Sequence, residues 1–256
     1  MRDASAHTTF SDTLPNNKKY LFEHSAIRRG DTTSRKMAIV FTGDEFGEGG
    51  KFILSALLKE NVKASFFHTG RFYRNPAFNG LVRKLKAQGH YLGAHSNAHL
   101  LYCDWVKRDS LLVTEKEFSA DLDKNYEALR QFGVKPRSAP YFLPPYEWYN
   151  DSIAAWTRKK GLQLISFSPG TLSSADYTSP KDNNYRSSEI IYTSIVNYDA
   201  RHPSGLNGFI LLLHIGAGPS RTDKFYQRLP QLIKWLKKRG YEPVRINELL
   251  QENEKN

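Results

Sequence analysis

The stretch Phe209-Ile210-Leu211-Leu212-Leu213-His214 decides the fold of this chain of 256 residues. Its first five residues are all apolar, so a strand built from them has no polar face to turn toward water. Strands that are buried on both faces are typical of parallel sheets covered by helices. The same kind of short apolar run recurs along the chain, at residues 37–41, 64–68, 91–94, 138–143, 162–167, 209–213 and 241–246.

Helical patterns separate these runs, at residues 51–60, 76–88, 114–132, 147–160, 188–200 and 222–239. The pattern at 114–132 is the clearest, because Thr114 and Glu117 form a capping box and Gly133 follows its end. Strands that alternate with helices pair in parallel through helical crossovers. The sequence therefore predicts an α/β fold, either an open doubly wound sheet or a closed barrel.

Residues 1–35 are polar and lack this rhythm, so we expect an irregular extension that lies against a single domain of residues 36–256. No run of 18 apolar residues exists, and the first residues lack the apolar core of a signal peptide. We expect a cytoplasmic protein, or a periplasmic or secreted one from which a signal peptide has been removed. Cys103 is the only cysteine, which excludes an internal disulfide.

The formal net charge is +11, which favours anionic surroundings such as a cell-wall polymer. The basic residues are scattered in short groups, so we interpret them as a solvated surface rather than a nucleic-acid track. We expect no nucleic-acid partner, and the sequence leaves the oligomeric state open.

Reactive side chains follow the predicted strands. In parallel α/β folds the carboxyl ends of the strands meet at one side of the domain, where active sites lie. This shared position indicates an enzyme, and the residues concerned are Asp44, Glu45, His68, His95, Pro144-Pro145-Tyr146, Ser168 and His214.

Glu45, His95 and His99 supply one carboxylate and two imidazoles, a set that suits zinc, or cobalt or nickel, with open positions for water. We expect His95 and His99 to share one face of a helical turn. Two surface histidines, and a turn or cap at Asp44-Glu45, are the alternatives. If the metal site forms, Asp44 is placed to take a proton from the bound water.

His214 ends the most apolar strand, across the strand mouths from the predicted metal. A histidine there is either hydrogen-bonded within the core or placed to protonate a leaving group. Asp176, in the irregular stretch 168–187, is the candidate to orient it.

These motifs resemble the polysaccharide deacetylase family, also called carbohydrate esterase family 4, over residues 36–250. The segment 89–99 is similar to the family's metal-binding His-Ser/Thr-x-x-His segment, and 42–45 to its Thr-Phe-Asp-Asp segment. Residues 144–146 resemble the Arg-Pro-Pro-Tyr segment, 212–214 the Leu-x-His segment, and 176–177, more weakly, the Asp-Trp segment.

The resemblance implies a distorted seven-stranded (β/α) barrel and a metal-dependent deacetylase. It implies that Asp44 is the base, that Glu45, His95 and His99 bind the metal, and that His214 is the general acid. Pro145 and Tyr146 would form a wall of the substrate groove, with the Tyr146 backbone N–H holding the oxyanion. Trp148, Trp105 and Tyr141 are candidates to stack on sugar rings, although a place in the core is the alternative.

The implied substrate is an acetylated poly- or oligosaccharide, first an N-acetylglucosamine-type amide and otherwise an O-acetyl ester. The alternative is a non-catalytic carbohydrate-binding protein on the same fold. Three residues depart from the family pattern. Gly43 replaces an aromatic residue, which we expect to loosen that wall, and Glu45 replaces aspartate. Leu143 replaces the arginine that steadies the catalytic carboxylate, and Arg71 is the candidate to replace it in space.

Overall fold

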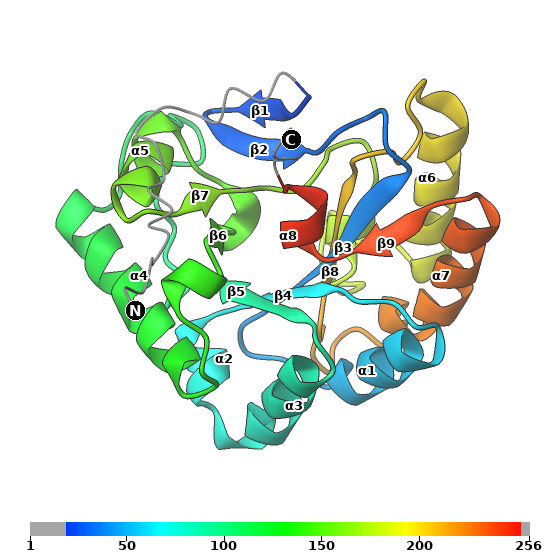
Figure 1. Cartoon of the computed structure of the whole chain (residues 1–256), viewed down its shortest axis with the longest axis horizontal. Coiled ribbons are helices and arrows are strands. Elements are labelled where there is room, and N and C mark those ends of the chain that lie inside the picture. The colour runs from blue at the N-terminus through cyan, green and yellow to red at the C-terminus, as the bar shows by residue number, and fades with distance from the viewer. Residues whose placement is uncertain (1–18, 252–256) are drawn as a thin grey trace, which may run out of the picture.

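A computed structural model describes residues 19–251, and its main feature is a curved sheet of seven parallel strands with helices around the outside (Figure 1). This is the distorted (β/α) barrel that the resemblance implied, and each predicted apolar run supplies one strand. The strands are β3 (Lys36–Gly43), β4 (Ser65–His68), β5 (Tyr91–Ala94), β6 (Tyr141–Phe142), β7 (Gln163–Leu164), β8 (Ile210–His214) and β9 (Glu242–Val244).

Strand β3 is the centre of the sheet. The strand order is β7-β6-β5-β4-β3-β8, and β9 also pairs with β3. Because β8 occupies one edge of β3, β4 and β9 share the other: β4 pairs with Val40–Gly43 and β9 with Lys36–Ala38. All these pairs are parallel, so the carboxyl ends of β3, β4, β5 and β8 meet on one side of the barrel.

An N-terminal hairpin, β1 (Leu21–Glu23) and β2 (Ala26–Arg29), lies between the two ends of the sheet. Ile27 forms a bridge to Ile165 just after β7, and Arg29 forms one to Phe209 just before β8. The prediction of an irregular segment is therefore wrong for residues 19–35, although these residues do lie against the domain. Residues 1–18 of the predicted extension lie outside the described part of the chain.

The helices are α1 (Gly50–Lys59), α2 (Gly70–Arg74), α3 (Pro76–Ala87), α4 (Glu115–Arg130), α5 (Asp151–Lys159), α6 (Ser188–Arg201), α7 (Leu229–Lys238) and α8 (Ile246–Leu249). The capping box that the sequence predicted at the start of α4 is present, with Thr114 accepting from the Glu117 N–H and Glu117 accepting from Thr114. Two short helices, α2 and α8, were not predicted, because five- and four-residue helices are too short to show a periodic pattern.

Two helices begin later than predicted. Helix α5 begins at Asp151 rather than 147, because Asn150 caps it and residues 146 and 147 have left-handed backbone conformations. Helix α7 begins at Leu229 rather than 222, since residues Phe225–Arg228 form a separate 3-10 turn. The first shift places Glu147 at the site described below rather than on a helix.

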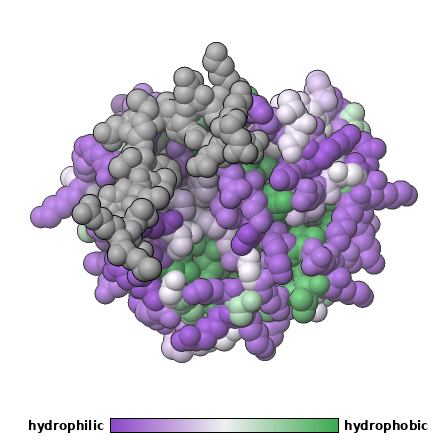
Figure 2. All heavy atoms as spheres, in the orientation of Figure 1, coloured by the Kyte–Doolittle hydropathy of each residue, from purple (hydrophilic) through white to green (hydrophobic). Residues whose placement is uncertain are grey.

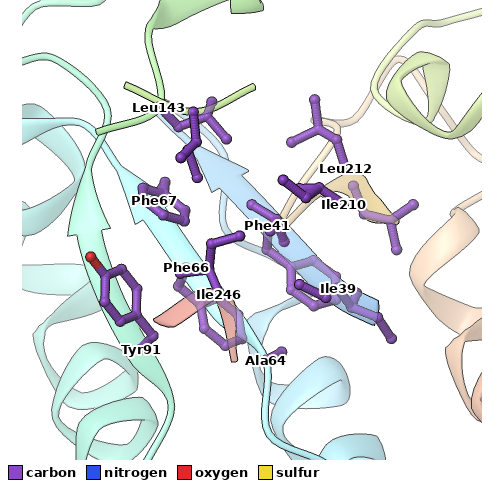
Figure 3. Packing of buried hydrophobic residues seen from close by; sticks show 14 of the residues in the cluster. Ile39, Phe41, Ala64, Phe66, Phe67, Tyr91, Leu143, Ile210, Leu212 and Ile246 are labelled. Atoms are coloured by element: carbon purple, nitrogen blue, oxygen red, sulfur yellow. The ribbon is translucent and has the colours of Figure 1, made fainter. Parts of the chain in front are cut away.

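The core lies inside the curved sheet. Figure 3 shows Ile39 and Phe41 of β3 with Ile210 and Leu212 of β8, and all four side chains are fully buried. Ile246 of α8 joins them, and its backbone N–H donates to Ser65 Oγ at the start of β4. Helix α8 therefore covers the amino ends of the strands, which leaves the carboxyl ends for the site.

One face of the molecule is mainly polar. On the face shown in Figure 2, hydrophilic residues predominate and hydrophobic residues form small separate areas. Within residues 19–251, no helix has both the length and the apolar character that a membrane span requires.

Candidate active site

A pocket of about 340 Å³ opens at the carboxyl ends of the strands. Most of the predicted reactive residues meet there: the lining includes Asp44, Glu45, His95, His99, Tyr146 and His214. His68 and Ser168 also follow strands, but both are buried and neither lines the pocket. The sequence prediction of a common site is confirmed for six of its residues.

Asp44 is held by two residues from the start of α2. Thr69 Oγ1 donates to Asp44 Oδ1 at 2.7 Å, and Arg71 Nε donates to the same oxygen at 3.1 Å. Arg71 Nη2 donates to the other oxygen, Oδ2, so the guanidinium forms a bidentate contact with the carboxylate. Leu143, at the position of the family's arginine, is fully buried among apolar residues. Arg71 therefore makes the contact with the Asp44 carboxylate for which it was the candidate.

The segment that carries His95 and His99 is an irregular turn, so the prediction of a helical turn is wrong. Ser96 and His99 have φ values of 69° and 57°, in the left-handed region, which no α-helix contains. The buried carboxylate of Asp121 holds this turn: it accepts from Ser96 Oγ at 2.6 Å and from the next two backbone N–H groups at 2.9 and 3.0 Å.

A second polar residue of α4 fixes the start of the turn. Asn125 Oδ1 accepts from the His95 backbone N–H at 2.8 Å, and Asn125 Nδ2 donates to the carbonyl of His68. Sequence reasoning missed Asp121 and Asn125. They stand four residues apart within the buried stripe of α4, so polar side chains on an apolar helix face were the available signal.

The two imidazoles lie together despite the irregular backbone, with ring centroids 5.2 Å apart. His95 Nδ1 is 2.8 Å from the carbonyl oxygen of Leu143. Because a carbonyl only accepts, Nδ1 carries the hydrogen, which leaves the lone pair of Nε2 for a metal. Burial lowers the pKa of His95 well below 6.5, and burial also lowers the pKa of His99 even though Asp44 opposes it. Both rings are therefore neutral at pH 7, as metal ligands must be.

The third predicted ligand does not complete the set. Glu45 is exposed and lines the same pocket, but no three His, Cys, Asp or Glu side chains within residues 19–251 stand close enough together to hold a metal ion. The donor chemistry of His95 and His99 fits a divalent transition metal. The structure therefore brings His95 and His99 together in one pocket, and the roles of His95, His99 and Glu45 as metal ligands stay predictions.

His214 forms a dyad with Asp176. His214 Nδ1 is 2.6 Å from Asp176 Oδ1, and the His214 backbone N–H donates to Asp176 Oδ2 at 2.9 Å. Burial lowers the pKa of His214, but the charge and hydrogen bond of Asp176 and the charge of Glu147 outweigh burial, so its pKa is raised above 6.5. The contact predicted between these residues is confirmed, and it favours the protonated ring that a general acid needs.

The loop that carries Asp176 is fixed by a fully buried arginine. Arg221 donates to the carbonyl of Thr178 at 2.7 Å and to that of Arg186 at 3.0 Å. These bonds stabilise an otherwise irregular segment, so Asp176 stays in contact with His214.

Aromatic side chains surround the pocket mouth. Phe46, Trp105, Tyr146 and Tyr177 line it and are 40–54% exposed, which is unusual for large apolar groups. The Tyr146 ring lies 4.5 Å from His99 and 5.4 Å from Trp105.

Other residues predicted to contact substrate are not part of the lining. Pro145 is buried, and Trp148 donates Nε1 to the carbonyl of Asp104 at 3.1 Å while packing beside Trp105. Tyr141 is half-buried and donates its hydroxyl to the carbonyl of Leu250. Pro145 and Trp148 therefore lie outside the lining, next to Tyr146 and Trp105, and their contact with substrate stays a prediction.

The pocket wall at Gly43 is closely packed by neighbouring side chains, whereas we expected the glycine to loosen it. A Cβ at this position would lie 2.6 Å from Ile215 Cγ2 and 2.8 Å from His68 Nδ1. The buried His68 ring packs 4.1 Å from Phe72, and it occupies space beside the glycine. Gly43 is therefore required by its neighbours.

Glu147 is a pocket residue that the sequence did not single out. It lines the pocket near His214, and burial raises its pKa to about 7. The sequence predicted a helix over residues 147–160, so Glu147 was assigned to a helix and not to the site. The consecutive left-handed residues that place Glu147 carry no glycine or asparagine signal.

Comparison with known proteins agrees with the architecture. The chain is 26% identical to the peptidoglycan-N-acetylglucosamine deacetylase PgdA of Listeria monocytogenes, over 91% of this chain and 43% of that protein. The crystal structure of Bacillus subtilis PdaA, a family 4 carbohydrate esterase, superposes with a TM-score of 0.68 at 23% identity, covering 89% of this chain and 85% of PdaA. A family 4 pseudoenzyme from Bacillus anthracis superposes equally well, with a TM-score of 0.68 at 19% identity over 90% of this chain and 70% of that one.

The family itself is settled by sequence. The profile of the family described as polysaccharide deacetylase matches residues 30–165, which is more than half of the chain. This span contains β3 to β6 and with them Asp44, His95 and His99. The chain belongs to the polysaccharide deacetylase family, on the barrel of carbohydrate esterase family 4.

Proposed function

We propose that this protein is a metal-dependent hydrolase that removes acetyl groups from a poly- or oligosaccharide, with an N-acetylglucosamine-type amide as the first substrate. One observation carries the proposal. Two acid–base groups, Asp44 and His214, are each oriented by a partner of their own and line the same pocket as a pair of neutral histidines. A site that only binds sugars has no need of such partners.

Asp44 acts as the base. Its carboxylate is fixed by Thr69 and Arg71, and it takes a proton from the water that attacks the acetyl carbonyl. A divalent cation, which we propose that His95 and His99 hold together with Glu45, lowers the pKa of water and polarises a carbonyl when bound. Zinc is the first candidate, with cobalt and nickel next.

His214 acts at the other end of the reaction. Asp176 raises the pKa of His214 and so favours the protonated ring, which can donate a proton to the departing amine or hydroxyl. The Tyr146 backbone N–H is the proposed donor to the oxyanion, a kind of contribution worth about 3 kcal/mol. Acetate and the deacetylated sugar are the products.

The aromatic rim favours a carbohydrate. Flat exposed rings at the pocket mouth, such as Trp105 and Tyr177, offer faces on which sugar rings stack. The names of relatives such as the Listeria deacetylase agree with an N-acetyl group as the target.

The experiment measures acetate release from N-acetylated chitooligosaccharides, peptidoglycan fragments and acetylated xylan, with zinc, cobalt, nickel or a chelator. The proposal expects release that depends on added metal and is greatest on an N-acetylated sugar. Binding of these glycans without acetate release under any metal would instead identify a non-catalytic carbohydrate-binding protein.

A further inference from the structure

The six long helices all end on the same side of the barrel. Each of them, α1 and α3 to α7, connects two strands that run parallel in the sheet, so it begins near the carboxyl ends of the strands and ends near their amino ends. The last turns of these helices, with the connections that lead from them into the next strands, form what we call the amino-end face. This face lies opposite the pocket, which opens at the carboxyl ends of the strands.

Cations predominate in the last turns of the helices. The six last turns contain nine lysines and arginines, with at least one in every helix. They contain two acids, Glu127 and Asp199, and Asp199 is buried and bonded to Arg239. The first turns, at the pocket side, contain four acids and two lysines. The two ends of the barrel therefore differ in charge.

The connections add to the charge of the amino-end face. A helix C-terminus favours a nearby cation, and this effect accounts for one cation in each last turn. The six connections contain one acid, Glu60, which is paired with Lys237. They also contain five more lysines and arginines, namely Lys63, Lys135, Arg137, Lys160 and Arg239. Basic groups that are scattered along the sequence are thus brought onto one face by the fold.

Much of this charge has no acidic partner. Lys160 is paired with Asp123, but within residues 19–251 no ion pair joins Lys59, Lys63 or Arg130 to an acid. The helices that supply the cations lie on all sides of the barrel (Figure 1). The positive charge is therefore spread over a broad face and does not follow a single groove.

The amino-end face presents charge without exposed aromatic rings. Among the described residues, no exposed aromatic side chain is in a last turn or a connection, since these side chains are Phe46, Phe52, Trp105, Tyr146 and Tyr177. Trp156 and Trp235, in the last turns of α5 and α7, pack against the core. Proteins that bind sugars or single-stranded nucleic acids stack them on exposed rings. The amino-end face fits a partner that is recognised by its charge.

We propose that the amino-end face docks on an anionic lipid bilayer, with the pocket turned to the opposite side. The headgroups of anionic lipids present negative charge over a plane, which matches a broad basic face. The attraction decays within a screening length of the bilayer surface, so the cations of this face contribute and those near the pocket contribute little. In this position the pocket stays open to a substrate that lies outside the bilayer.

The test measures co-sedimentation of the full chain with two kinds of vesicle, one of phosphatidylcholine alone and one that also contains phosphatidylglycerol. Wild-type protein should bind the vesicles that contain phosphatidylglycerol at least about tenfold more tightly than the neutral ones. Binding should be lost when the salt concentration rises from about 0.1 M to about 1 M, because the screening length falls from about 10 Å to about 3 Å. The measurement needs no turnover, so its result is independent of the proposed function.

Two double variants remove the same charge from opposite ends of the same two helices. Lys59→Gln with Arg130→Gln changes the last turns of α1 and α4, and Lys51→Gln with Lys116→Gln changes their first turns. All four side chains are exposed, so both variants should fold as wild type does. The first variant should bind the anionic vesicles about tenfold less tightly than wild type, and the second should stay within twofold of wild type.

Four results would overturn the inference. Wild-type protein that does not bind the anionic vesicles, or that binds neutral vesicles equally well, excludes docking by charge on lipid. Equal losses in the two double variants would show that overall charge, and not the amino-end face, drives binding. Wild-type protein that binds soluble poly-L-glutamate but not the vesicles would identify an anionic polymer as the partner instead of a bilayer.

Discussion

Arg71 provides the most informative single substitution, because it stands where the family pattern gives no arginine. Arg71→Met keeps the length of the side chain and removes both hydrogen bonds to Asp44. Thr69 still donates to Asp44 Oδ1 at 2.7 Å, so the carboxylate loses its cation but keeps one anchor. The expected result is a base that is less well positioned in an otherwise intact pocket.

The magnitude follows from the geometry of the pair. A hydrogen bond to a charged group contributes about 1.5–3 kcal/mol. Because 57% of the Arg71 side chain is exposed, water screens the interaction, and we take the lower end, about 1.5 kcal/mol, for the two bonds together. That loss corresponds to roughly a tenfold fall in kcat. KM should stay close to its wild-type value, since Arg71 does not line the pocket.

The assay is the steady-state release of acetate from N-acetylated chitooligosaccharide, with kcat and KM determined separately. Arg71→Lys should recover only part of the loss, because lysine cannot reproduce the two-armed contact. Arg130→Met, an exposed residue at the end of α4, is the control and should behave as wild type. If Arg71→Met keeps kcat within twofold, or changes only KM, the positioning role is refuted.

Three further predictions concern pH and stability. Asp176→Asn should lower kcat, and the pH above which kcat declines should also fall. Asp176 raises the pKa of His214, which must be protonated to act, so removing its charge lowers that pKa. A pH–rate profile of kcat checks this. Burial lowers the pKa of His68 to about 3, so only the unfolded chain binds this proton between pH 6.5 and 3, and stability falls as pH drops through that window. Urea unfolding at pH 7.5 and at pH 5 measures how far the free energy of unfolding falls between them. In His68→Phe this fall should be smaller than in wild type by about 2 kcal/mol, and an equal fall would contradict the burial argument. Gly43→Ala should destabilise the fold by about 1–3 kcal/mol in urea unfolding, because its Cβ would meet His68 Nδ1 at 2.8 Å. Gly80→Ala, which has open space inside α3, should be neutral or stabilising, and equal effects of the two changes would contradict the packing argument.

The sequence predicts the sheet well because its strands are buried on both faces. Each apolar run became a strand, and reactive residues at the run ends met in one pocket, since parallel strands end on the same side. Residues 26–29 were not predicted as a strand, because β2 has four residues and two of them are arginines, so it does not form an apolar run. The partners of β2 lie 138 and 180 residues away, at Ile165 and Phe209, and local patterns carry no information about such distances.

The site was predictable in its members but less so in its geometry. His95 and His99 meet through an irregular turn, because Asp121 and Asn125 reach them from α4 and override the spacing typical of a helix. The weakest of the sequence matches, Asp176, turned out to contact His214 directly.

Glu147 was not predicted as a site residue, because its position also depends on an irregular backbone. Its place in the pocket comes from two left-handed residues, a conformation that propensity assigns to glycine or asparagine. Backbone strain that is stabilised by the surrounding structure leaves no local mark in a sequence.

The central claim is that Asp44 is the base of a metal-dependent deacetylase. One paired measurement on Asp44→Asn tests it most directly: acetate release from N-acetylated chitooligosaccharide, and zinc affinity by calorimetry on the same protein. We expect turnover to fall by about 10²–10⁴-fold. Zinc affinity should stay close to that of wild type, because Asp44 is not among the proposed ligands. Full turnover in this variant, or a wild-type protein that binds zinc and yet releases no acetate from any acetylated carbohydrate, would contradict the account.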